Sequence, residues 1–104
     1  MILYYDRKGK PINDVLEWGR LLEDFKYKIV KQEYLSDGKW ISTVWLGLDH
    51  GFLPNHNKPL IFETMVFPKK GEFGDLDMAR YSTEAEAKLG HRAMVGMWNA
   101  KIKI

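Results

Sequence analysis

The sequence contains no cysteine among its 104 residues. This absence excludes disulfide bonds, iron–sulfur clusters, cysteine-ligated zinc and thiol catalysis. The chain also lacks a strong charge of either sign, because its ionisable side chains leave a formal net charge of only +2 at pH 7. Nucleic-acid-binding domains normally carry a clustered basic face. The charge pattern therefore argues against nucleic acid as a partner.

Long apolar runs and nucleotide-binding motifs are missing as well. No stretch approaches the ~20 apolar residues that a bilayer-spanning helix needs. Residues 1–6 lack the basic and apolar regions of a signal peptide. No glycine-rich phosphate loop or nucleophile elbow occurs, so we expect no cofactor. These absences predict a cytoplasmic protein without a membrane partner.

What remains is the composition of a folded protein. Hydrophobic residues make up 45% of the chain and aromatic residues 13%. A chain of this size buries enough surface to form a core without cross-links. We therefore expect a single domain over residues 1–104.

The clearest local pattern is a β-hairpin. Residues 27–35 and 40–48 are rich in β-branched and aromatic side chains, and they flank the pair Asp37-Gly38. An Asp-Gly centre favours a two-residue type I′ turn, which fixes the register of both strands. The predicted pairs are Leu35–Trp40, Tyr34–Ile41, Gln32–Thr43, Val30–Trp45 and Ile29–Leu46.

This register sorts the hairpin side chains onto two faces. We expect helices to cover the first, more aliphatic face, and we expect the second, aromatic face to bind a partner or a second copy of the chain. The first face carries Ile29, Leu35, Trp40, Val44, Leu46 and Leu48. The second face carries Val30, Tyr34, Ile41 and Trp45, with Gln32 and Thr43 between them.

The other elements complete an α+β fold. A short strand at 2–5 precedes a helix that either Asn13 or Asp14 caps, and strands follow at 60–67 and 78–81. The sequence Thr83-Glu84-Ala85-Glu86 is a capping box that starts the last helix. The predicted fold is an antiparallel sheet of three to five strands with two helices packed on one face, in the order β-α-β-β-β-β-α.

Polar residues within apolar segments are the candidates for chemistry. Glu63 lies in the middle of a strand, where an ionised carboxylate needs a partner, and an ion pair with Arg80 is the interpretation we favour. His50 and His91 form with Glu63 a metal-ligand set whose spacing matches no known motif. We favour a structural role for these histidines over metal binding.

One pattern extends over three segments of the chain, which are Ser42–His50, Pro59–Phe67, and Arg80–Ala87 followed by Gly90 and His91. Together these segments resemble a family of small uncharacterised proteins of phages, prophages and their bacterial hosts. The resemblance extends to the opening residues and the first helix. It implies a mobile-element setting, with the host cytoplasm as the location of a phage-encoded protein, and it implies no catalytic residue.

We hypothesise that an antiparallel arrangement brings these segments together at one end of the sheet, and we then expect their polar residues to be neighbours. The candidate site is Trp45, Asp49, His50, Glu63, Arg80, Tyr81 and His91. The favoured function is a non-enzymatic binding protein that modulates a host or phage protein, such as an inhibitor of a defence system. The alternatives are a binder of a nucleotide-like ligand through Trp45, Glu63 and Arg80, and a metal-assisted hydrolase using His50, Glu63 and His91.

Overall fold

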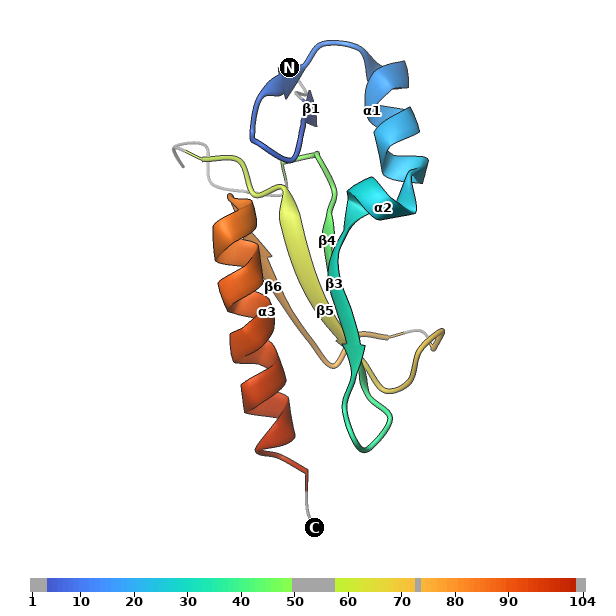
Figure 1. The fold of residues 1–104 in the computed structure, drawn as a ribbon, viewed down its shortest axis with the longest axis vertical. Coiled ribbons are helices and arrows are strands. Elements are labelled where there is room, and N and C mark those ends of the chain that lie inside the picture. The colour runs from blue at the N-terminus through green and yellow to red at the C-terminus, as the bar shows by residue number, and fades with distance from the viewer. Residues whose placement is uncertain (1–3, 50–57, 73, 103–104) are drawn as a thin grey trace.

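The main element of the fold is a four-stranded antiparallel sheet in which each strand pairs with its neighbours in sequence (Figure 1). The computed structural model describes residues 4–49, 58–72 and 74–102. Because β5 is apolar on both sides, it occupies a central position, as its sequence predicts. The strands are β3 (Ile29–Tyr34), β4 (Trp40–Trp45), β5 (Phe62–Phe67) and β6 (Asp77–Tyr81).

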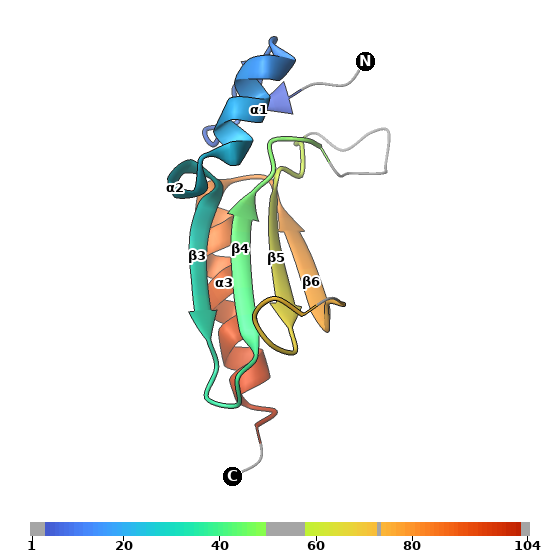
Figure 2. The same ribbon diagram turned by 90° about the vertical axis from the view of Figure 1, so that its right-hand side faces the viewer.

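One long helix, α3 (Glu84–Asn99), covers one face of this sheet (Figures 1 and 2). It begins at the predicted capping box, where the Thr83 hydroxyl accepts a hydrogen bond from the Glu86 backbone N–H. The helix residues that are buried recur at helical spacing. They are Ala87, His91 and Met94.

The N-terminal third of the chain forms a separate small layer at one end of the sheet. Its two strands, β1 (Tyr4–Tyr5) and β2 (Pro11–Ile12), pair with each other and pack against α1 (Val15–Glu23). Of the two predicted caps, Asn13 and Asp14, it is Asp14 that caps α1. Asp24 separates α1 from the short helix α2 (Phe25–Lys28).

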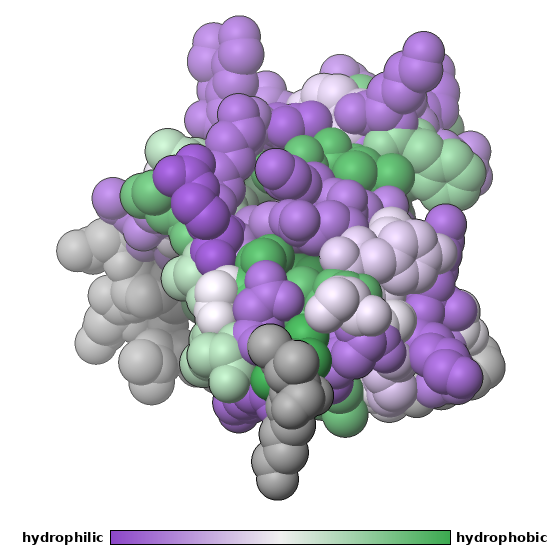
Figure 3. All heavy atoms as spheres, turned by 60° about the horizontal axis from the view of Figure 1, so that its bottom comes forward, coloured by the Kyte–Doolittle hydropathy of each residue, from purple (hydrophilic) through white to green (hydrophobic). Residues whose placement is uncertain are grey.

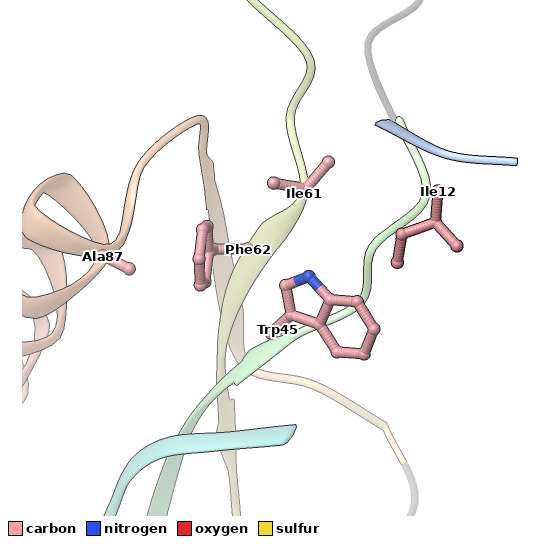
Figure 4. Packing of buried hydrophobic residues seen from close by; sticks show 5 residues of the cluster. All are labelled: Ile12, Trp45, Ile61, Phe62 and Ala87. Carbon is pink, nitrogen blue, oxygen red and sulfur yellow. The ribbon is translucent and has the colours of Figure 1, made fainter. Parts of the chain in front are cut away.

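Indole N–H groups hold this layer on the sheet. Trp18 of α1 donates to the Leu46 carbonyl at 2.9 Å, and Trp45 of β4 donates to the Tyr5 carbonyl at 3.1 Å. Gly47 has φ +70°, and a side chain there would collide with both indoles. The two layers therefore share one apolar cluster, which Figure 4 shows around Trp45 and Phe62. Its buried members are Ile12, Trp45, Ile61, Phe62 and Ala87.

Arg7 forms a second link between the N-terminal layer and the rest of the fold. Its guanidinium binds the Glu84 carboxylate at the start of α3 at 2.7 Å and donates to the Tyr27 carbonyl at 2.8 Å. Burial raises the pKa of Glu84, but hydrogen bonds from Lys88 and Arg7 oppose it, and the net pKa lies below the ordinary value. The ionised form of Glu84 therefore stabilises the fold.

We expect the Glu84 contribution to be fully present above the ordinary pKa of a glutamate carboxyl and to disappear as the pH falls from there through the lowered pKa of Glu84. Glu84→Gln should lower the melting temperature at pH 7 and should make melting less dependent on pH in this window. Thermal unfolding followed by circular dichroism across this range measures both effects. Glu23→Gln, at an exposed position on α1, is the matched control. Parallel pH curves for Glu84→Gln and the unmodified protein would contradict the assignment.

The β3–β4 hairpin forms where the sequence predicts it, but its register differs by one residue. Tyr34 pairs with Trp40 instead of Leu35, and Gln32 pairs with Ser42. The reason is the turn, which has three residues and not two. The Leu35 carbonyl accepts from the Gly38 N–H, and Gly38 has φ +91°. This is a type I turn followed by a left-handed glycine.

A β-bulge at Val30 then restores the predicted faces at the start of β3. Ile29 pairs with Val44, whereas Lys31 pairs with Thr43, so Val30 is the extra residue. Val30 packs on the cluster that contains Trp45, as predicted. The predicted faces of Gln32, Tyr34 and Leu35 are wrong, because these residues lie between the turn and the bulge.

The predicted fold class, α+β with an antiparallel sheet, is confirmed. The arrangement of helices differs from the prediction, because α3 covers the four-stranded sheet whereas α1 packs on the β1–β2 hairpin. The structure adds β2 and α2 to the predicted order. The covered face also differs, because α3 packs on the face of Ile41 and Trp45. The aromatic face that we expected to bind a partner is therefore core.

Two glycines of α3 differ in their surroundings. A Cβ at Gly90 would overlap the ring of Tyr81, whereas nothing lies within 4 Å of a Cβ at Gly96. We expect Gly90→Ala to lower the free energy of unfolding by about 1–3 kcal/mol through overpacking. Gly96→Ala should raise it by up to about 1 kcal/mol through helix propensity. Urea denaturation measures both, and effects of the same sign would contradict the close packing at Gly90.

Candidate functional site

Within the described residues, no helix or strand lies over the middle of the sheet face opposite α3, and the segment between β5 and β6 passes in front of its end near the β3–β4 turn (Figure 2). Alternation along the strands and the observed register assign three cross-strand rows to this open face. Each row contains apolar side chains, although the face is open to solvent. The rows are Ile29–Val44–Glu63–Arg80, Gln32–Ser42–Met65–Met78 and Tyr34–Trp40–Phe67.

A groove of about 560 Å³ runs over the first two rows and reaches the third. Apolar side chains from α2, β3, β4 and β5 line most of it. Lys28 from the end of α2 and Lys70 from the segment after β5 are its cationic residues. The apolar lining residues are Phe25, Ile29, Val44, Leu46, Met65 and Phe67.

The aromatic row lies at the end of the sheet near the β3–β4 turn. The rings of Tyr34 and Trp40 are 4.6 Å apart at 55°, and the Lys70 ammonium lies 5.0 Å from the centre of the Trp40 ring. Tyr34 is 58% exposed, so a flat apolar surface is available there. Figure 3 brings this end of the molecule forward and shows apolar residues as patches between hydrophilic ones.

The polar groups inside the open face satisfy each other. Gln32 donates to the Ser42 hydroxyl at 2.8 Å, and the Arg80 guanidinium donates to the Glu63 carboxylate at 3.0 Å. The predicted ion pair of Glu63 is thus confirmed. These pairs give each polar side chain in the middle of the face a partner within the face, so the apolar side chains beside them are the groups left without a covering layer.

The covered face contains a buried chain of hydrogen bonds under α3. The hydroxyls of Thr43 and Thr64 are 2.5 Å apart, and Thr43 lies 2.6 Å from Nδ1 of His91. Nε2 of His91 lies 2.7 Å from the Glu33 carboxylate. A neutral imidazole accepts at one ring nitrogen and donates at the other. Thr64 can then donate to Thr43, Thr43 to His91 Nδ1, and His91 Nε2–H to the Glu33 carboxylate, so all four groups are satisfied.

The order hydroxyl, imidazole, carboxylate is also the order in which hydrolases activate a nucleophile. Here the hydroxyl belongs to Thr43, which is 0% exposed, and His91 is 2% exposed. A substrate cannot reach a hydroxyl that has no solvent contact. The chain of hydrogen bonds is therefore part of the core and fixes the position of α3 on the sheet.

We expect Thr43→Val to lower the free energy of unfolding by about 1–3 kcal/mol, because it leaves both His91 Nδ1 and the Thr64 hydroxyl buried without a partner. Thr64→Val should cost less, since Thr43 still donates to His91 in that variant. Chemical denaturation of the two variants tests this order. An equal or reversed order would show that the hydrogen bonds do not form a directed chain.

The structure separates the site residues that the sequence groups together. Glu63 and Arg80 lie on the open face, whereas His91 lies under α3. Tyr81 faces α3 at Gly90, and Trp45 is 0% exposed in the shared core. The Asp49 carboxylate accepts from the Leu60 backbone N–H. His50 lies outside the described residues.

The ligand-binding and metal-hydrolase alternatives each need side chains that lie on opposite faces of the sheet. The ligand site of Trp45, Glu63 and Arg80 draws on both faces, and so does the metal set of Glu63 and His91. Within residues 4–49, 58–72 and 74–102, no cluster of three or more His, Asp or Glu side chains could hold a metal ion. Neither alternative has a formed site in the described structure.

The sequence analysis did not identify Lys28, Met65, Phe67 or Lys70 as site residues. The signal for Met65 and Phe67 was present in the sequence, because alternation along β5 places both on the same face as Glu63. It was missed because the helix was assigned to the wrong face. Lys28 and Lys70 lie outside the strands, so periodicity carries no signal for them.

Comparison of the chain with protein-family models, curated proteins and solved structures finds no match. Among the residues that the structure describes, no helix combines the length and apolarity of a membrane-spanning segment. Function is therefore inferred from the open face and its chemistry.

Proposed function

We propose that this protein is a small non-enzymatic binding protein that docks on another protein through the open face. One observation carries the proposal: every row of this sheet face contains apolar side chains, and no helix or strand of the described residues lies over its middle. One-sided antiparallel sheets normally present polar residues to water. A contiguous exposed apolar surface in a folded protein is typical of an interaction site.

The composition of the face also fits a protein interface. Aromatic residues and methionine are enriched at the centres of interfaces, and here Trp40, Tyr34, Met65 and Met78 lie together. The ion pair of Glu63 is internal, so docking would not leave its charge unpaired. Rigid strands hold all of these side chains, which lowers the entropic cost of binding.

The resemblance to phage and prophage proteins supplies the setting of the proposal. In that setting the partner is a host or phage protein in the cytoplasm, and a component of a bacterial defence system is the partner we propose. The protein would act by occupying a surface of that component, because binding alone is sufficient for inhibition.

Replacing the two methionines of the central row tests the proposal. We expect Met65→Gln with Met78→Gln to weaken binding about tenfold or more, because two apolar side chains are lost from the interface. Affinity capture from a lysate of the host, quantified by mass spectrometry, compares this variant with the unmodified protein. Met97→Gln, at an exposed position on α3, is the matched control.

Support requires a captured protein that the double variant loses and the control retains. Circular dichroism melts of all three proteins establish that they fold to the same extent. If no captured protein depends on Met65 and Met78, the open face is not a docking site and the proposal fails.

A further inference from the structure

The open face carries two positive charges that no acidic group compensates. The charged residues lining the groove are Lys28, Glu63 and Lys70, and Glu63 is bound by Arg80. Lys70 contacts the ring of Trp40, and neither lysine forms an ion pair within the described part of the chain. Two unpaired ammonium groups therefore border an otherwise apolar and neutral surface.

The lysines lie toward opposite ends of the apolar strip. Lys28 directly precedes Ile29, which belongs to the same row as Val44, whereas Lys70 lies over Trp40. Val44 and Trp40 are four residues apart on β4, which corresponds to about 13 Å at about 3.3 Å per residue. A complementary surface is thus apolar in the middle and acidic on both sides.

We infer that the partner is a protein that presents an apolar segment flanked by Asp or Glu residues, which pair with Lys28 and Lys70. This inference rests on the proposed function, since it assigns the chemistry of the partner at the same face. Charge complementarity of this kind determines which partner binds and how fast it associates.

Two other occupants fit the face less well. In an isologous dimer, Lys28 and Lys70 of both copies would lie in one interface. The four ammonium groups would have no acidic partner there and would repel each other. A nucleic acid would need many cationic contacts to phosphates, whereas this face offers two free lysines and a centre of aliphatic side chains.

A displayed library of random peptides tests the inference without knowledge of the natural partner. Peptides selected on the unmodified protein should be enriched in Asp and Glu on both sides of apolar residues. The variant Lys28→Glu with Lys70→Glu should bind them at least tenfold more weakly and should select Lys and Arg instead. The matched control is Lys31→Glu with Arg92→Glu, which has the same change in charge on the α3 side.

The variant Met65→Gln with Met78→Gln separates the two proposals. If the selected peptides depend on the methionines but show no acidic enrichment, or bind both charge variants equally, the inference is overturned and the docking face remains. If no selected peptide depends on the methionines, the docking face fails as well.

Two further measurements test the competing occupants directly. The first is analytical ultracentrifugation. If the unmodified protein is a dimer and the methionine variant is not, the open face binds a second copy of the chain. The second is fluorescence anisotropy with a short oligo(dT) strand. If the strand binds and its binding depends on the lysines but not on the methionines, the open face binds nucleic acid. Either result overturns the inference, and a monomer without affinity for oligo(dT) supports it.

Discussion

The register of β3 against β4 is the constraint on which the rest of the structure depends. Side chains alternate between the two faces of a strand, so a register decides which residues of neighbouring strands lie together. Here it places Ile41, Thr43 and Trp45 on the face that α3 covers, and Trp40, Ser42 and Val44 on the opposite face. Every property of the two faces follows from that division.

The two faces bury different kinds of groups. The covered face holds the shared hydrophobic cluster at one end, the chain from Thr64 to His91 in the middle and Met94 toward the other end. Because the polar chain is internally satisfied, the helix packs on it without leaving a buried polar group unpaired. The open face has paired polar groups too, but no helix covers its apolar residues.

Much of the fold was predictable from the sequence because its signals are local. The capping box at Thr83, the cap at Asp14 and the apolar character of β5 identify their elements without knowledge of the rest of the chain. The Glu63–Arg80 pair was also predictable, since a charge in a buried strand requires a partner.

The site was not predictable, for two physical reasons. Asp-Gly is compatible with both a two-residue turn and a three-residue turn, and the choice shifts the register by one. Neither composition nor periodicity states which of two apolar faces a helix will cover. Both uncertainties concern long-range packing, and they explain why Trp45 was assigned to a binding surface although it lies in the core.

The short turn at Ser36–Gly38 has a consequence for how this protein can evolve. One residue gained or lost there would move β3 against β4 and exchange the faces of its side chains, unless the bulge at Val30 changed at the same time. The connection between β5 and β6, which is longer, is free of that coupling. Length variation among descendants of this sequence should therefore accumulate after β5 and be rare before β4.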